Sequence, residues 1–519
     1  MADKSQADAG GRAATTVPTR ADVGVPPRQK ATGFLGRFTV LRGAMPELWI
    51  TFAVKFLGVA AYAVMNSTLV LWLSSDLGYN DEKALGLIGV WAVLMTVFTI
   101  LAGSLTDALG MRKTFLLGVA ICVIARLAMT FTTVKWLALG VGLFPLAVGE
   151  ALGTPVMVAA IRRYSTTAQR SISFSMFYVM MNLGFLVQGL IFDGVRRGLG
   201  EYGHFTLPIL GTTLSTYQTL FFVSLLLEVV LVPVLYFGIR EGAEASEEGV
   251  RITPAGARRE SSGTHSLGRT LAMTVRNTLR DTGRNMAALS REPGFYRLLT
   301  FLMLIAGVKF VYMTMTYAYP KFGIRELGAG APLGQLWSVT NSALIIILVP
   351  IVGALSQKTS AYRMVTFGCF VVAASVFVLT LPTVWFRGLA DGPVGWAVGH
   401  LYLGLTGSVN PWYLMLFLFV VLYSFGEAFY SPRVYEYAAA IAPKGQEASY
   451  GALSYVPFFL AKLFVGTFSG VLLTRYCPET GPRNAQTMWL VIALMALIAP
   501  VGLVVLRRVI RVREAGRED

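Results

Sequence analysis

Long apolar runs separated by short polar segments occupy most of the chain between residues 47 and 510. A helix needs about 20 apolar residues to cross the hydrocarbon core of a bilayer, so this pattern predicts membrane-spanning helices. We expect twelve, with apolar cores near residues 49–74, 84–106, 114–134, 136–161, 172–194, 218–239, 296–319, 334–356, 364–383, 411–432, 449–473 and 488–508. The predicted fold class is therefore an all-α polytopic membrane protein.

Two longer polar interruptions organise these spans. The first separates six spans from six, and its part from Leu267 to Ser290 fits either a basic amphipathic helix on the membrane surface or a solvated linker. The second, near 384–410, is rich in Gly and Trp and predicts a loop or a short interfacial hairpin. The expected organisation is a disordered cytoplasmic tail (1–46), a six-helix bundle (47–239), a cytoplasmic linker (240–295), a second six-helix bundle (296–510) and a cytoplasmic tail (511–519).

Basic residues are distributed unevenly between the two sets of loops. With both termini in the cytoplasm, 31 of the 44 Lys and Arg residues lie on the cytoplasmic side and nine on the other side. This asymmetry predicts cytoplasmic termini, because Lys and Arg accumulate in cytoplasmic loops. It also accounts for most of the net charge of +16 without a nucleic-acid partner. Arginine outnumbers lysine, and we expect a bacterial inner (plasma) membrane.

Composition excludes several classes of protein. Hydrophobic residues make up 55% of the chain and charged residues 14%, against about 25% charged in ordinary globular proteins. This excludes a soluble enzyme. The three cysteines are scattered, there are only three histidines, and the sequence holds no phosphate-binding loop motif. We therefore expect no disulfide framework, no metal, no cofactor and no direct use of ATP.

The loop after the second span carries a recognisable pattern. It reads Gly103-Ser-Leu-Thr-Asp107-Ala-Leu-Gly110-Met-Arg112-Lys113, and the loop after span eight reads Gly353-Ala-Leu355-Ser-Gln357, then Arg363. The first resembles the signature loop of the major facilitator superfamily, and the second resembles a degenerate copy. The resemblance implies two six-helix halves, secondary transport by alternating access, and a loop that latches the halves together. The alternative is a generic basic turn.

Spans five and ten suggest a branch of that superfamily. Span five carries Phe177-Tyr178 followed by Asn182-Leu-Gly184, and span ten carries Gly426-Glu427 with Ser431-Pro432, then Ala442-Pro443. These segments resemble a divergent member of the proton-dependent oligopeptide transporter family. The resemblance implies proton-coupled uptake of a small polar solute such as a di- or tripeptide.

The first span departs from that family. Where the family has Glu-x-x-Glu-Arg-Phe, this chain has Thr51, Val54, Lys55 and Phe56, and the family's fourth-helix lysine falls on Val158. Both acids used for proton coupling are therefore replaced. A facilitator or exporter of a non-peptide solute accordingly remains an alternative. A membrane-embedded transferase would need a polar catalytic cluster in a loop, which the sequence does not show, and twelve spans in two halves disfavour a receptor.

Seven charged residues lie well inside the predicted spans, away from the span ends, and are candidates for function. They are Lys55, Arg126, Glu150, Glu228, Lys309, Glu427 and Lys462. A charge at mid-bilayer costs at least about 2.5–3.5 kcal/mol, so such residues usually face a partner or a water-filled cavity. Arg126 and Glu228 fit packing or helix-pair roles better than ligand roles.

The remaining charges are candidate solute ligands. By the resemblance, Glu427 faces the amino group of the substrate, and its carboxylate can also take up a proton. The alternative is a structural pair with Lys309 or Lys462. Lys309 and Lys55 can bind a substrate carboxylate or pair internally, and Glu150 can supply the protonation lost from span one. Polar residues at helical spacing complete the expected site: Tyr62, Asn66, Tyr178, Asn182, Tyr312 and Ser431. We expect the protein to be a monomer in the bilayer.

Overall fold

The computed structural model describes residues 38–511 except 241, 247–248, 253–275, 357–358, 442–460, and 277–289 other than 280, 284 and 287. Eleven of the described helices are long and apolar enough to cross a membrane. The predicted span 449–473 is described only from residue 461, so the count of twelve lies partly outside the described residues. The same holds for most of the linker, including 267–275 and most of 277–289, and for Gln357, Ala442 and Pro443.

The N-terminal half holds six long helices. It comprises η1 (Phe38–Leu41), α2 (Pro46–Ser75), α3 (Asp81–Leu109), α4 (Met111–Phe131), α5 (Lys135–Leu137), η2 (Ala138–Leu143), α6 (Phe144–Tyr164), α7 (Thr167–Leu199) and α8 (Thr216–Gly238), with antiparallel hairpins β1 (His204–Thr206)–β2 (Thr213–Ser215) and β3 (Ala243–Ser246)–β4 (Gly249–Ile252). Residues 38–45, which we expected to be disordered, are ordered. Leu41 and Met45 are buried in the same core as Leu48, because their apolar side chains gain from leaving water.

The C-terminal half follows the same plan. It comprises α10 (Pro293–Tyr317), α11 (Tyr319–Leu327), η4 (Gln335–Val339), α12 (Thr340–Leu355), α13 (Ala361–Phe377), η5 (Val378–Thr380), η6 (Thr383–Phe386), α14 (Arg387–Ala390), α15 (Pro393–Gly395), η7 (Trp396–Tyr402), α16 (Pro411–Ile441), η8 (Val465–Ser469), α19 (Gly470–Tyr476), α20 (Ala485–Val505) and α21 (Arg507–Ile510). The Gly- and Trp-rich insertion is thus a series of short helical turns, from which Trp385 and Trp396 project exposed indole rings.

Polar caps explain why several helices begin before their apolar cores. The side chain of Asn80 accepts a hydrogen bond from the backbone N–H of Lys83 at the start of α3. Capping boxes begin α7, at Thr166 and Gln169, and α8, at Ser215 and Gln218. Such caps satisfy N–H groups that have no partner within the helix. The polar residues beside each apolar run therefore set where these helices start.

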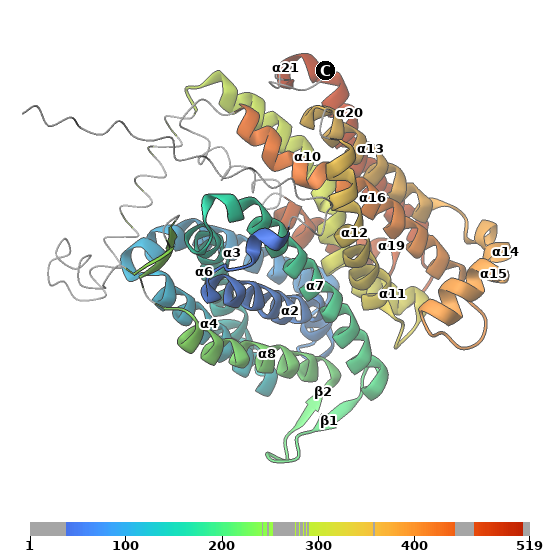
Figure 1. Cartoon of the computed structure of the whole chain (residues 1–519). Coiled ribbons are helices and arrows are strands. Elements are labelled where there is room, and N and C mark those ends of the chain that lie inside the picture. Colours follow the sequence, from blue (N-terminus) through green and yellow to red (C-terminus); the bar gives the residue numbers. More distant parts are fainter. Residues whose placement is uncertain are drawn as a thin grey trace, which may run out of the picture.

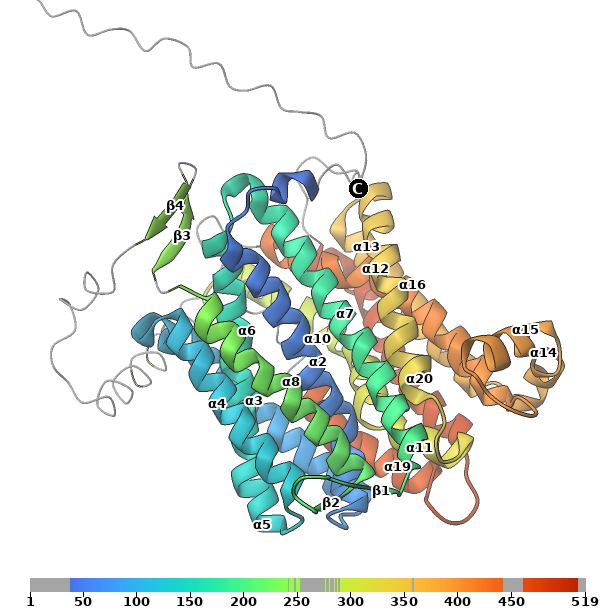
Figure 2. The same ribbon diagram turned by 60° about the horizontal axis from the view of Figure 1, so that its bottom comes forward.

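The two halves lie side by side, the first drawn in blue to green and the second in yellow to red (Figure 1). Figure 2 shows β1–β2, α11 and α19 at one end of the bundle, which we call the hairpin end. Strands β3 and β4 lie at the opposite end. A solute site between the halves would lie between these two ends.

Glycines bring the halves into close contact toward the hairpin end. A Cβ atom added to Gly466 would lie 2.6 Å from the Cα of Gly89, and one added to Gly334 would lie 2.4 Å from the carbonyl oxygen of Gly189. Neither pair has room for a side chain. These contacts join α3 to η8 and α7 to the start of η4, so backbone packing closes this end of the bundle.

Candidate functional site

Glu427 lies buried on α16, where the second half supplies it with two kinds of partner. The amide nitrogen of Asn341, on α12, donates hydrogen bonds to Glu427 Oε2 at 3.0 Å and to Ser424 Oγ at 2.9 Å. Lys309, on α10, attracts the Glu427 carboxylate electrostatically. This attraction favours the alternative of a charge pair with Lys309, and residues of three helices act on one carboxylate.

Aromatic side chains of α10, α16 and η4 pack together near this carboxylate. The ammonium of Lys309 lies 4.9 Å from the centre of the Tyr430 ring, a cation–π distance. Tyr312, one turn after Lys309 on α10, packs on Trp337 with ring centroids 5.8 Å apart, and Trp337 contacts Tyr423 at 5.3 Å. The sequence predicted Tyr312 here, but it did not indicate Trp337, which the chain carries on η4.

The N-terminal half presents a second basic group from α2. Lys55 is buried, and its ammonium lies 4.4 Å from the centre of the Phe177 ring on α7. Further along α2, Tyr62 stacks on Trp91 of α3 with centroids 6.3 Å apart. Two of the predicted site residues of α2, Lys55 and Tyr62, therefore contact aromatic side chains of neighbouring helices.

Tyr317, in the second half, interacts with two of the predicted site residues of α2. Its side chain on α10 interacts with those of both Tyr62 and Asn66 on α2. The sequence predicted Tyr62 and Asn66 but not Tyr317. This contact between α2 and α10 spans the boundary between the halves, where a solute moving by alternating access would pass.

Glu150 belongs to a buried group of charges, which we call the Arg126 triad: Arg126 on α4, Glu150 on α6 and Glu228 on α8. Arg126 Nη2 donates to Glu150 Oε1 at 2.6 Å, and Arg126 Nη1 lies 3.3 Å from Glu228 Oε2. Glu150 is also attracted by Lys55 and by Lys462 of the second half. Glu150 therefore has a hydrogen bond with Arg126 and is also attracted by two lysines.

Tyr178, Asn182 and Ser431 have less specific surroundings. The Asn182 amide donates to the backbone carbonyl of Tyr178 at 2.9 Å, one turn earlier on α7. Tyr178 packs against an apolar cluster that includes Ile345 and Val352 of α12, so it lies at the boundary between the halves. Ser431 is half-buried near the end of α16.

The predicted signature loop forms the tight turn from α3 to α4. Gly110 has a φ of 86°, a backbone conformation that favours glycine, and ends one helix as the next begins. Arg112 donates to the carbonyl oxygen of Tyr236 at 2.6 Å and lies over its ring, while Lys113 is exposed. These contacts of Arg112 stay within one half. Gly103 lies in α3, and the side chain of Asp107 is outside the described part of the chain.

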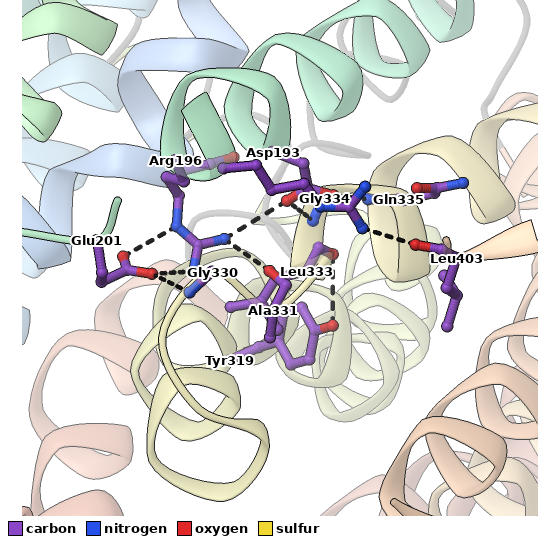
Figure 3. Close-up of polar contacts among 12 residues, drawn as sticks. Asp193, Arg196, Glu201, Tyr319, Gly330, Ala331, Leu333, Gly334, Gln335 and Leu403 are labelled. Carbon is purple, nitrogen blue, oxygen red and sulfur yellow. Dashed lines mark hydrogen bonds and ion pairs between the residues drawn. The ribbon is translucent and has the colours of Figure 1, made fainter. Parts of the chain in front are cut away.

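A polar cluster at the hairpin end was not predicted. Arg196 Nε donates to Glu201 Oε1 at 2.9 Å, and Arg196 Nη1 donates across the boundary to the carbonyl oxygen of Ala331 at 3.0 Å (Figure 3). Glu201 also accepts from the N–H of Gly330, and Asp193 accepts from the N–H groups of Gly334 and Gln335. We call Asp193, Arg196 and Glu201 the Arg196 latch. In the sequence, the indication of this latch was three charged residues near the end of the predicted span 172–194.

A second contact supports the same closure. Asp81, at the start of α3, lies 3.0 Å from Lys321 Nζ and 2.8 Å from Arg325 Nη1, both on α11 of the other half. Arg325 also donates to the carbonyl oxygen of Cys477. Charged groups therefore join the halves at two separate places at the hairpin end.

Glu201 is held ionised in this arrangement. Burial alone would raise the pKa of its carboxyl group, but the hydrogen bonds and charge of Arg196 outweigh burial and keep that pKa below its ordinary value. The ionised carboxylate is the form that binds Arg196. Protonation of Glu201 would accordingly loosen the latch.

Comparison with known proteins identifies the fold. Residues 48–392 match the family model described as Major Facilitator Superfamily. A solved POT family transporter in complex with a thioalcohol-conjugated peptide is 16% identical, with a TM-score of 0.62 over 91% of this chain and 97% of that one. An auto-inhibited POT family peptide transporter is 15% identical, with a TM-score of 0.62 over 91% and 99%. No curated protein matches the chain.

A third solved structure also shares the fold. A bacterial homologue of the human drug peptide transporters is 16% identical, with a TM-score of 0.57 over 89% of this chain and 99% of that one. At such identities the likeness concerns the fold. The predicted all-α polytopic membrane fold is thereby confirmed at the level of the superfamily.

Proposed function

Because this chain belongs to the Major Facilitator Superfamily, whose members include secondary transporters, we propose that it carries a small zwitterionic solute by alternating access in symport with protons, with di- and tripeptides as the first candidates. The observation that carries this proposal is the placement of buried charges of opposite sign on facing halves. Glu427 lies on α16, and Lys55 lies on α2. A solute with an ammonium group and a carboxylate would complement both.

Glu427 is the proposed ligand of the ammonium group. Asn341 fixes one carboxylate oxygen by its hydrogen bond of 3.0 Å, which orients the side chain. Lys309 now compensates its charge, and a solute ammonium would take over that role. Tyr312, on the next turn of α10 after Lys309, and Ser431, one turn after Glu427, are the proposed neighbours of the bound solute.

Lys55 and Lys462 are the proposed ligands of the carboxylate. Each is attracted by Glu150 in this structure, so a solute carboxylate would compete with Glu150 for them. Tyr62, Asn66, Tyr178 and Asn182 are proposed as polar contacts on the same side. This arrangement gives a short peptide one binding partner at each end.

The closed hairpin end supports a state of the transporter in which that side is shut. If the termini are cytoplasmic, the hairpin end faces outward, and the latch residues Asp193, Arg196 and Glu201 hold that side shut. The solute would then exchange with the cytoplasm. Opening at the hairpin end would require breaking these contacts between α7 and the segment before α12.

The test is uptake of a dipeptide panel into proteoliposomes, with and without a pH gradient. Dialanine uptake should exceed uptake of N-acetyl-dialanine, which lacks the ammonium group. Glu427→Gln should reduce dialanine binding at least tenfold, which corresponds to about 1.4 kcal/mol, and should remove the preference over the acetylated peptide. Glu326→Gln, near the hairpin end, is the control. Absence of peptide binding by folded protein would refute the peptide assignment.

One observation favours a second candidate, a facilitator or exporter of a non-peptide solute. Thr51 and Val54 stand where the resembled family has its two acids. A facilitator would equilibrate the solute without regard to the pH gradient. Uptake that responds to the gradient decides in favour of symport.

A further inference from the structure

We propose that Glu228, in the Arg126 triad, is a proton-binding site of the N-terminal half and carries the proton that accompanies the solute. The coupling to solute rests on the proposed function, whereas proton binding by Glu228 does not. The triad holds two carboxylates for one guanidinium, and Arg126 is fully buried. An uncompensated carboxylate inside a membrane protein is costly, and a proton neutralises it.

The two acids of the triad are not held equally. Glu150 receives the 2.6 Å hydrogen bond from Arg126 and is attracted by Lys55 and Lys462 as well. Glu228 lies 3.3 Å from Arg126 Nη1, which makes no hydrogen bond within the described part of the chain. The charged groups that act on Glu228 there are Arg126, which attracts it, and Glu150, which repels it. Glu228 is therefore the acid with less compensation.

Arg126 is held in place and cannot readily turn to favour Glu228. Its Nε donates to Ser224 Oγ at 2.8 Å, and Ser224 Oγ donates to the carbonyl oxygen of Ala61 on α2 at 2.7 Å. Ser224 and Glu228 are one turn apart on α8, so the same helix fixes the guanidinium and presents the second acid. These hydrogen bonds hold the Arg126 guanidinium in the orientation in which it donates to Glu150.

Solute binding would change the charge felt at Glu228. A carboxylate that binds Lys55 and Lys462 brings negative charge beside Glu150 and weakens the attraction between Glu150 and the lysines. More negative charge near a carboxyl group favours its protonated form. Solute and proton should therefore bind with mutual preference, which is the requirement for symport. Because Lys462 belongs to the second half, its distance from Glu150 also changes as the halves rock.

The first experiment needs no solute. Infrared difference spectra of the protein in liposomes are recorded as the pH is raised, and the carbonyl stretch of a protonated, buried carboxyl group is followed. This band should be present in the wild type, lost in Glu228→Gln, shifted in frequency in Glu228→Asp, and retained in Glu427→Gln. A wild type without such a band, or a band unchanged in Glu228→Gln, would overturn the proposal. A chain that fails to bind peptides can still give this result.

The second experiment tests coupling with dialanine in proteoliposomes. Glu228→Gln should still exchange labelled for unlabelled dialanine at equal pH, because exchange requires no net proton movement, but should lose all acceleration by a pH gradient. Ser67→Ala, which removes the partner of Gln188 elsewhere in this half, is the control. Gradient-driven uptake that survives in Glu228→Gln, or uptake driven by sodium rather than protons, would overturn the assignment.

Discussion

The carboxylate of Asp193 accepts a hydrogen bond from the backbone N–H of Gly334, at 2.9 Å, although the two residues belong to opposite halves of the molecule. Asp193 also accepts from Gln335 at 2.7 Å. These N–H groups lie at the start of η4, where a helical backbone leaves donors without partners and favours negative charge. A side chain of one half therefore caps a helix of the other.

Replacing Asp193 with Asn should favour opening at the hairpin end. The amide group has one fewer acceptor and no negative charge, and hydrogen bonds to charged groups contribute about 1.5–3 kcal/mol each. The fraction of open molecules should rise at least tenfold. Spin labels at Ile209 and Trp385, which are exposed on opposite halves, would report the change as longer distances. Asp391→Asn, on the exposed turn after α14, should leave the distances unchanged, and unchanged distances in Asp193→Asn would contradict the latch.

Adding one methyl group at Gly334 should have a similar effect by a steric route. The new Cβ would lie 2.4 Å from the carbonyl oxygen of Gly189, and that atom cannot move without moving α7. We expect Gly334→Ala to separate the halves at the hairpin end in the same spin-label measurement. Gly388→Ala, where the added atom meets nothing within 4 Å, is the matched control. Equal distances in both variants would show that backbone contact does not hold this end closed.

Acid should weaken the latch through Glu201. Because the folded protein holds the pKa of Glu201 below its ordinary value, the stabilisation is present above that ordinary value, about 4.3, and is lost as the pH falls through the lower, folded value. The open fraction should therefore rise at acidic pH in the spin-label measurement. Glu201→Gln should be more open at neutral pH and should lack this acid step. If Glu201→Gln still shows the same rise in the open fraction at acidic pH, another group causes it.

Lys55 should select solutes with a free carboxylate. Lys55→Gln removes one proposed ligand of that group, so dialanine should bind at least tenfold more weakly, or about 1.4 kcal/mol. Dialanine amide, which has no carboxylate, should be affected little. Binding to purified protein is measured by calorimetry, with Lys113→Gln, an exposed residue of the signature loop, as control. An equal loss for both peptides would indicate that Lys55 stabilises the fold instead.

Much of the architecture follows from the sequence. The length of the apolar runs predicts the membrane-spanning helices, and the signature loop around Gly110 and Arg112 predicts the superfamily. Buried ionisable residues stand out in such runs, so the sequence also indicated Glu427, Lys309 and Glu150. The prediction of the spans succeeds because a bilayer penalises every polar group within a single span, whatever the span packs against.

Only the tertiary structure decided how those residues are paired. The sequence predicted packing or helix-pair roles for Arg126 and Glu228 and treated Glu150 as a separate candidate, whereas the fold joins all three in one group. It likewise missed that Arg196 contacts Ala331, 135 positions away in the chain. Hydrophobic patterning specifies which residues enter the membrane, but it carries no information on which face of one helix meets another. That choice depends on close backbone contacts, such as Gly189 with Gly334, and on charges that find partners only when the halves assemble.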